Sequence, residues 1–91
     1  MAVQLILTGR VQRVFCRNYC QENARKLNLK GSASNLPDGS VKVILNTEDD
    51  SLISEYIRLI KENPHDFQFF GEITGIKKKE YSGSFEGDYN F

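Results

Sequence analysis

The beginning of the chain alternates apolar and polar side chains in the manner of a β-strand. A strand over residues 2–8, buried on at least one face, is predicted by the alternate positions of Val3, Leu5 and Leu7. We expect Gly9 to end it. The period then changes, and residues 16–27 carry apolar side chains at helical spacing. These are Cys16, Cys20, Ala24 and Leu27. Residues 28–31 are expected to leave this helix.

A hairpin is predicted next. Within residues 35–40, Pro37 presets its own φ and Gly39 supplies a positive φ, which is the chemistry of a tight turn. The alternating apolar positions of residues 41–45 predict one strand of the hairpin. The other strand would be residues 31–34, although their serines and glycine favour β structure only weakly.

The second half of the chain predicts another helix and another strand. The acidic and hydroxyl side chains at 49–51 provide caps and negative charge at a helix start, and Pro64 limits continuation. The apolar stripe of this helix consists of Leu52, Ile53, Tyr56, Ile57 and Ile60. Residues 67–76 are aromatic and β-branched and predict a strand that bends at Gly71. Residues 81–91 carry a weaker strand pattern.

The expected order is therefore β-α-β-β-α-β. It predicts an α+β, ferredoxin-like (split βαβ) sandwich, in which an antiparallel sheet carries two helices on one face. The chain has 91 residues and no low-complexity linker, so we expect one domain over residues 1–91 with one modest core. This fold supports many activities, so the function must be argued from a site.

The charge balance limits the classes of partner. Lys and Arg number 12 and Asp and Glu number 12, so nothing draws the whole chain toward nucleic acid or acidic membranes. The N-terminal apolar run lacks the charged start of a signal peptide, and no stretch has the length of a membrane span. Two cysteines are too few for a disulfide framework or a zinc site. We expect a cytoplasmic monomer that binds neither nucleic acid nor membrane.

The connection between the first strand and the first helix is the strongest candidate for chemistry. Residues 9–17 read G-R-V-Q-R-V-F-C-R. A strand-to-helix loop leaves backbone N–H groups free, and the helix N-terminus adds positive potential, so an anion is favoured there. Arg17, in the first helical turn, is placed to fork two phosphate oxygens. From spacing alone, a solvated arginine beside an ordinary loop fits as well.

Two blocks of the sequence resemble the acylphosphatase family. Residues 9–17 resemble its G-x-V-Q-G-V-x-F-R pattern, matching at Gly9, Val11, Gln12, Val14 and Arg17. The second block, residues 31–41, resembles the family's second signature through Gly31, Asn35 and the run D-G-S-V. The resemblance is clear from residue 3 to about residue 64 and looser beyond. It implies hydrolysis of a small-molecule acyl phosphate to a carboxylate and inorganic phosphate.

The resemblance also implies roles for individual residues. Arg17 would bind the phosphoryl group and Asn35 would position the attacking water, without metal or cofactor. Without the resemblance, Asn35 would be read as a turn residue that bonds to the backbone before Pro37. The phosphate-binding loop would consist of Gly9, Val11, Gln12, Arg13, Val14, Phe15 and Cys16.

Three positions depart from the family pattern. Arg13 stands where the family has glycine, Cys16 where it has phenylalanine, and Ser32 where a large aromatic residue is common. If the loop needs a positive φ at Arg13, a side chain there costs roughly 1–2 kcal/mol. The Arg13 side chain would either cover the anion site or add its positive charge to the attraction for phosphate. We expect phosphate binding with slow turnover, and the alternative is a catalytically weak anion-binding ferredoxin-like module.

The remaining candidate groups favour structural roles. His65 follows a proline and has no partner for acid–base work, so an exposed loop position is expected. Cys16 and Cys20 are expected to fill the core. Residues 77–79, three lysines, are expected to be solvated. Residues 67–70 include three phenylalanines that we assign to core packing. The third possibility, an RNA-binding or protein-binding ferredoxin-like domain, lacks the aromatic and basic signature that RNA recognition uses.

Overall fold

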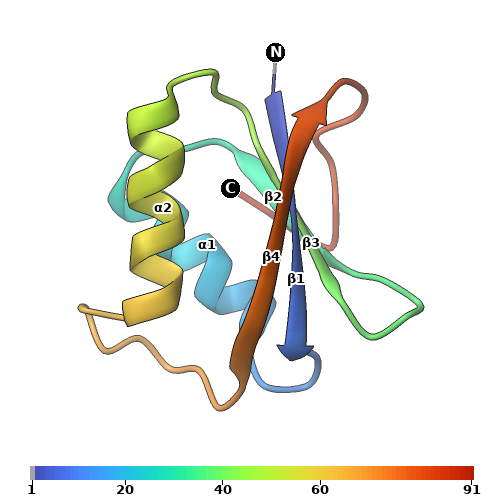
Figure 1. Ribbon diagram of the computed structural model, residues 1–91, viewed down its shortest axis with the longest axis vertical. Helices are drawn as coiled ribbons and strands as arrows, with labels where there is room; N and C mark the ends of the chain where they lie inside the picture. The colour runs from blue at the N-terminus through green and yellow to red at the C-terminus, as the bar shows by residue number, and fades with distance from the viewer. Residues whose placement is uncertain (1) are drawn as a thin grey trace.

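The computed structural model describes residues 2–91, and within them five antiparallel strands form one sheet that carries two helices on one face (Figure 1). In chain order the elements are β1 (Ala2–Arg10), α1 (Cys16–Lys26), β2 (Gly31–Asn35), β3 (Val41–Leu45), α2 (Asp50–Glu62), β4 (Glu72–Tyr81) and β5 (Tyr89–Asn90). The strand order is β4-β1-β3-β2-β5. The predicted ferredoxin-like α+β arrangement is therefore confirmed.

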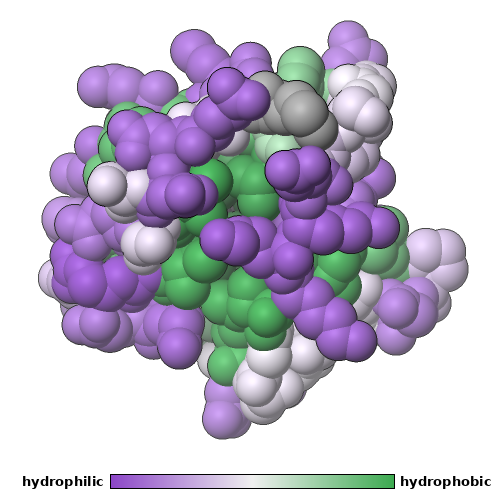
Figure 2. Space-filling model, turned by 45° about the horizontal axis from the view of Figure 1, so that its top comes forward, coloured by the Kyte–Doolittle hydropathy of each residue, from purple (hydrophilic) through white to green (hydrophobic). Residues whose placement is uncertain are grey.

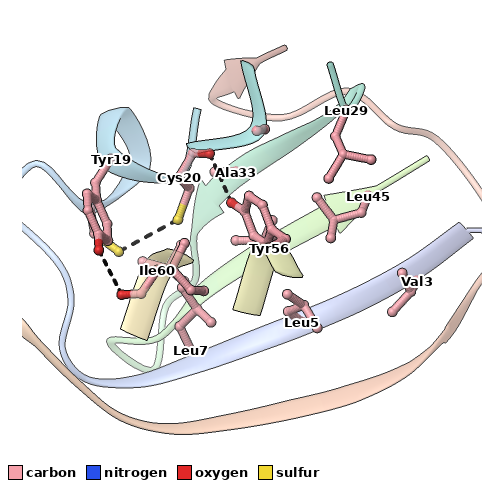
Figure 3. Close-up of a cluster of buried hydrophobic side chains, with 14 of the residues drawn as sticks. Val3, Leu5, Leu7, Tyr19, Cys20, Leu29, Ala33, Leu45, Tyr56 and Ile60 are labelled. Atoms are coloured by element: carbon pink, nitrogen blue, oxygen red, sulfur yellow. Dashed lines mark hydrogen bonds between the residues drawn. The ribbon is translucent and has the colours of Figure 1, made fainter. Parts of the chain in front are cut away.

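The core lies between the sheet and the two helices (Figure 3). β1 lies between β4 and β3, and its Leu5 and Leu7 pair with Val43 and Val41 of β3. All four side chains are fully buried. Within the described residues 2–91, no helix is long and apolar enough to cross a membrane.

The cysteines of α1 lie in this core as predicted. Cys16 and Cys20 are free buried thiols whose sulfur atoms are 4.0 Å apart. The hydrogen bond between Cys20 and Cys16, together with burial, raises the pKa of Cys20 well above its ordinary value. Its thiol therefore stays protonated at neutral pH, which makes it a packing group rather than a nucleophile.

Two buried tyrosines join the helices to each other. The Tyr19 hydroxyl of α1 donates to the carbonyl oxygens of Leu59 and Ile60 in α2, at 3.2 and 2.8 Å. The Tyr56 hydroxyl of α2 donates to the carbonyl oxygen of Cys20 in α1 at 2.9 Å. Burial raises the pKa of Tyr19 to about 12. Each ring thus fills the core while its polar end satisfies a carbonyl of the opposite helix.

The prediction that Gly9 ends the first strand was wrong. β1 continues to Arg10 because β4 supplies partners as far as Glu72, and the register shifts between Thr8 and Gly9. Gly9 has φ +119°, and a Cβ at this position would collide with the carbonyl oxygen of Glu72. Thr74 of β4 is the residue that the register skips, so β4 carries the bulge and Gly9 lies opposite it inside β1.

The predicted strand over residues 67–76 is displaced toward the C-terminus. Residues 67–70 lie outside any strand, and β4 begins at Glu72 and includes the three exposed lysines. Its extent follows β1, with which it pairs back to Ala2. Phe67 and Phe69 pack against the core as predicted, whereas Phe70 is 55% exposed, so its assignment to the core was wrong.

The smaller boundaries also follow pairing. Gly31, expected both at the end of the helix exit and at the start of the hairpin strand, is the first residue of β2 and pairs with Leu45. The last strand, expected within residues 81–91, contains only two residues. Asp49 caps α2 as predicted, since its side chain accepts from the N–H groups of Ser51 and Leu52. His65 is exposed, also as predicted.

The surface between α2 and β4 exposes apolar side chains. Figure 2 shows apolar side chains open to view between α2 and β4. A groove of about 290 Å³ lies there, and its walls include Ile57, Ile73 and Ile76 beside Lys61 and Lys78. The helix layer therefore does not cover the outer edge of the sheet completely.

Replacing the interhelical hydroxyls should reduce stability. Tyr19→Phe leaves the Ile60 carbonyl without its donor, and Tyr56→Phe removes the bond to Cys20. We expect each variant to lower the free energy of unfolding by about 1 kcal/mol, measured by urea unfolding with an unchanged m-value. Tyr81→Phe is the control, because its bond to Ser84 is exposed and water replaces it. Equal losses in all three variants would contradict the interpretation.

Candidate functional site

The connection between β1 and α1 has an unusual backbone. Residues 11–15 join the two elements, and two of them, Arg13 and Phe15, have positive φ values of 63° and 64°. Phe15 occupies the N-cap position of α1 but provides no side-chain cap. Within residues 2–91, the backbone N–H groups of residues 12–17 donate to no protein acceptor. The loop therefore presents a row of free donors at a helix N-terminus.

This loop forms one wall of an open cavity of about 200 Å³. The other walls come from the first turn of α1, the end of β2 and the start of β5. The lining residues are Val11, Arg13, Phe15, Cys16, Arg17, Asn18, Asn35 and Tyr89. The structure thus brings together Arg17 and Asn35, which were proposed from the sequence as partners. Of the loop residues named with them, Gly9, Gln12 and Val14 are not in the lining.

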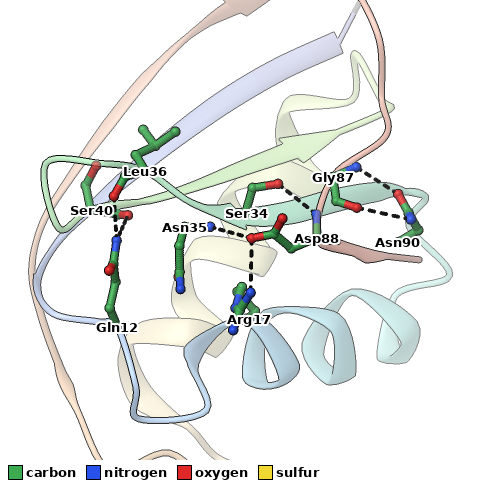
Figure 4. A network of polar contacts seen from close by, with 9 residues as sticks. All are labelled: Gln12, Arg17, Ser34, Asn35, Leu36, Ser40, Gly87, Asp88 and Asn90. Atoms are coloured by element: carbon green, nitrogen blue, oxygen red, sulfur yellow. Dashed lines mark hydrogen bonds and ion pairs between the residues drawn. The ribbon is translucent and has the colours of Figure 1, made fainter.

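Gln12 instead ties the loop to the hairpin turn (Figure 4). Its side-chain amide donates to the carbonyl oxygens of Leu36 and Ser40 at 2.7 and 2.9 Å. Asp38 closes the same turn by accepting from the N–H of Ser40 at 2.9 Å and from its hydroxyl. These bonds lower the pKa of Asp38. Gln12 therefore fixes the distance between the loop and Asn35, which directly precedes the turn.

The Asn35 side chain has an unused acceptor. Its Oδ1 atom is buried and has no hydrogen-bond partner among the described residues. A buried acceptor without a donor costs about 1–3 kcal/mol. Asn35 itself lines the cavity, so this unused acceptor belongs to a side chain that a molecule in the cavity would contact.

Arg17 is held by the C-terminal segment. Its Nη1 atom lies 3.0 Å from Oδ2 of Asp88, and its guanidinium carbon lies 5.0 Å from the ring centre of Tyr89. The same Asp88 oxygen accepts the backbone N–H of Asn35 at 3.1 Å. One carboxylate therefore contacts both residues that the sequence proposed for the site (Figure 4).

The pKa of Asp88 is lowered by these contacts. The backbone N–H of Asn35 contributes most and the Arg17 side chain comes next. The guanidinium has five N–H donors, and only Nη1 is used here. The other N–H donors of the guanidinium have no hydrogen bond to a described residue.

Sequence reasoning missed Asn18, Asp88 and Tyr89. Asn18 follows Arg17 directly, and that adjacency was the available signal. Asp88 and Tyr89 come from a segment with a weak strand pattern, and only the pairing of β5 with β2 brings them to the site. Among residues 2–91, no three His, Cys, Asp or Glu side chains gather in the way that would hold a metal ion.

The link between Asp88 and Arg17 predicts a pH-dependent stability. Because the folded-state pKa of Asp88 is lowered, its contribution is present above its ordinary value of 3.8 and is lost as the pH falls through the lower folded value. Asp88→Asn should therefore be less stable than the unmodified chain at neutral pH, and the difference should shrink below pH 3.8. Chemical unfolding at several pH values measures it. A difference that does not change with pH would contradict this assignment.

Comparisons with known proteins agree with the geometry. The acylphosphatase family model matches residues 3–88. An acylphosphatase from Methanocella arvoryzae is 38% identical over 83 residues, covering 90% of this chain and 93% of the relative. One from Lactococcus lactis is 31% identical over 78 residues, covering 82% and 80%.

Solved structures share the fold. The crystal structure of acylphosphatase from Bacillus subtilis has a TM-score of 0.73 and 26% sequence identity, and the match covers 94% of this chain and 93% of that one. An acylphosphatase from Coxiella burnetii has a TM-score of 0.71 at 22% identity, covering 91% and 82%. The matched residues, the relatives of similar length and the common fold together show that this chain belongs to the acylphosphatase family of enzymes.

Proposed function

We propose that this chain hydrolyses the carboxyl–phosphate bond of a small-molecule acyl phosphate in the cavity between Arg17 and Asn35. The observation that carries the proposal is the buried, unpartnered Oδ1 of Asn35 in the same cavity as the Arg17 guanidinium. An acceptor for water and a donor for phosphate are the two groups that this hydrolysis needs. The family membership supplies the reaction class.

The phosphoryl group would bind to Arg17 and the loop amides. Residues 12–17 offer N–H groups without protein acceptors, and the N-terminus of α1 adds positive potential. The guanidinium keeps donors free beside its bond to Asp88. Because the whole chain has no net charge, attraction for the anion must come from local charges and dipoles such as these.

Asn35 would orient the water. Its Oδ1 accepts a hydrogen bond from the water, and a neutral amide does not repel the phosphate as a carboxylate would. The water oxygen attacks phosphorus, and the bond from phosphorus to the acyl oxygen breaks. The electron pair leaves with the carboxylate, and the water's protons end on inorganic phosphate and solvent. Fixed donors around the equatorial oxygens stabilise the charge in the transition state.

The lining of the cavity favours an acyl phosphate over an alkyl phosphate ester. Among the described residues that line it, none is Asp, Glu or His. An alkoxide leaving group needs a proton from such an acid, whereas a carboxylate leaves without one. The absence of a carboxylic or imidazole acid in the lining therefore matches the good leaving group of an acyl phosphate.

Removing the two central side chains should have different effects. Arg17→Ala should lose phosphate binding and reduce kcat/KM for acetyl phosphate by at least about a hundredfold. Asn35→Ala should keep phosphate binding but reduce kcat by roughly a hundredfold, because the water is no longer oriented. Both are measured by acetyl phosphate hydrolysis with chelator present, and binding by product inhibition.

Arg25→Ala is the matched control for the arginine. Arg25 lies on the same helix, forms a surface ion pair with Glu22 and is not part of the cavity. Its variant should hydrolyse acetyl phosphate at the rate of the unmodified chain. Turnover that survives in Arg17→Ala, or that the chelator abolishes, would refute the proposed site.

Arg13→Gly should relieve backbone strain in the loop and raise kcat/KM. Its φ of 63° is the left-handed conformation in which a side chain costs about 1 kcal/mol. We expect Arg13→Gly to be at least as stable as the unmodified chain, and kcat/KM to rise because the side chain no longer lines the cavity. Arg13→Ala separates the two effects, since it removes the long side chain but keeps the strain. Urea unfolding and acetyl phosphate kinetics measure them, and an unchanged kcat/KM in both variants would show that Arg13 does no harm.

A further inference from the structure

Two exposed phenylalanines lie together beside the cavity. Phe15 and Phe70 are each 55% exposed, and their ring centres are 5.7 Å apart with the planes tilted by 55°. We call these two residues the aromatic pair. One other large hydrophobic residue among residues 2–91 is exposed, Phe85 at 38%, and it contacts Tyr81 elsewhere on the chain.

The aromatic pair is built from both segments that meet at the loop. Phe15 itself lines the cavity with Arg17 and Asn35. Phe70 belongs to the segment before β4, and its backbone N–H donates to the carbonyl oxygen of Val14 at 3.2 Å. The two rings are therefore anchored to the same loop that presents the free backbone donors, so their position relative to the cavity is set by backbone contacts.

The backbone conformation at Phe15 places its ring outside the core. Phe15 has a positive φ, a conformation that a bulky residue adopts only where the surroundings impose it. The result is a large apolar ring in contact with water rather than in the core, where burial would be favourable. A neighbouring pair of such rings next to a site is the arrangement expected of a binding surface.

The proposed reaction indicates which part of the substrate the aromatic pair would contact. An acyl phosphate has two ends, and the phosphoryl end would occupy the loop donors and Arg17. The acyl end must then point away from these donors, along the lining that includes Phe15. A ring or alkyl group there would contact aromatic carbon, whereas a methyl group is too short to bury much surface against it.

We propose that the aromatic pair binds the acyl group of the substrate and selects acyl phosphates with an apolar, aryl-sized acyl group over small ones. This inference rests on the proposed function, because it assumes that the phosphoryl group sits at Arg17. Phe15 and Phe70 determine specificity and take no part in bond breaking.

The test compares benzoyl phosphate with acetyl phosphate in the full chain. Phe70→Ala should lower kcat/KM for benzoyl phosphate by roughly three- to tenfold and leave kcat/KM for acetyl phosphate nearly unchanged. Phe15→Ala, which alters a residue of the phosphate-binding loop, should lower kcat/KM for benzoyl phosphate more than kcat/KM for acetyl phosphate. The ratio of the two values is compared between variants, so the different intrinsic reactivities of the substrates cancel. Inhibition by inorganic phosphate should not change, because phosphate has no acyl group.

The controls separate binding of the acyl group from support of the loop. Phe85→Ala removes an exposed ring away from the cavity and should leave the ratio unchanged. Phe70→Ala alters the pair without changing the left-handed position at Phe15, so a folding defect of the loop cannot mimic the result. Benzoyl and acetyl phosphate rates that fall equally would mean a structural role and would overturn the inference.

The outcomes also distinguish this inference from the proposed function. If the unmodified chain hydrolyses both substrates and the ratio is the same in Phe15→Ala and Phe70→Ala, the inference is wrong and the proposed function stands. If it hydrolyses neither substrate, both are wrong. A selective loss for benzoyl phosphate in the two variants, with Phe85→Ala unaffected, supports both.

Discussion

The short connection between β1 and α1 is the constraint on which the site depends. The chain leaves the sheet at Arg10, the end of β1, and is helical from Cys16, so five residues must carry it from one layer to the other. Two left-handed residues make this reversal, and one of them takes the N-cap position without offering a side-chain cap. The backbone donors that a cap would have satisfied stay free, and free donors at a helix N-terminus favour an anion.

The same constraint explains the exposed ring. A residue in the left-handed region directs its side chain differently from its helical neighbours, so Phe15 does not join the core beside Cys16. Free amides and an exposed aromatic group are thus two consequences of one backbone conformation. The cost of that conformation is borne by the rigid elements on either side, β1 between two strands and α1 bonded to α2 through tyrosines.

The C-terminal segment completes the site through close backbone contact. Asp88 reaches Arg17 because the segment lies directly on β2, where the Asp88 N–H donates to the Ser34 hydroxyl at 3.0 Å. A Cβ at Gly87 would come within 3.0 Å of Ser32. The serine at position 32, which departs from the family's aromatic residue, thus leaves room for this segment. Its small side chain helps to bring a carboxylate to both Arg17 and Asn35.

The sequence by itself determined the order of the elements, the apolar face of each helix and the cap at Asp49. Through the family resemblance it also indicated that Arg17 and Asn35 lie at the same cavity. These features depend on local periodicity, turn chemistry and short motifs, which neighbouring residues encode. Only the tertiary structure decided where β4 begins, that β1 continues through Gly9 opposite a bulge in β4, and that Phe70 is exposed. It also decided that Tyr89 lines the cavity and that Asp88 reaches Arg17. Each of these depends on pairing or packing with residues far away along the chain, so no local pattern specifies it.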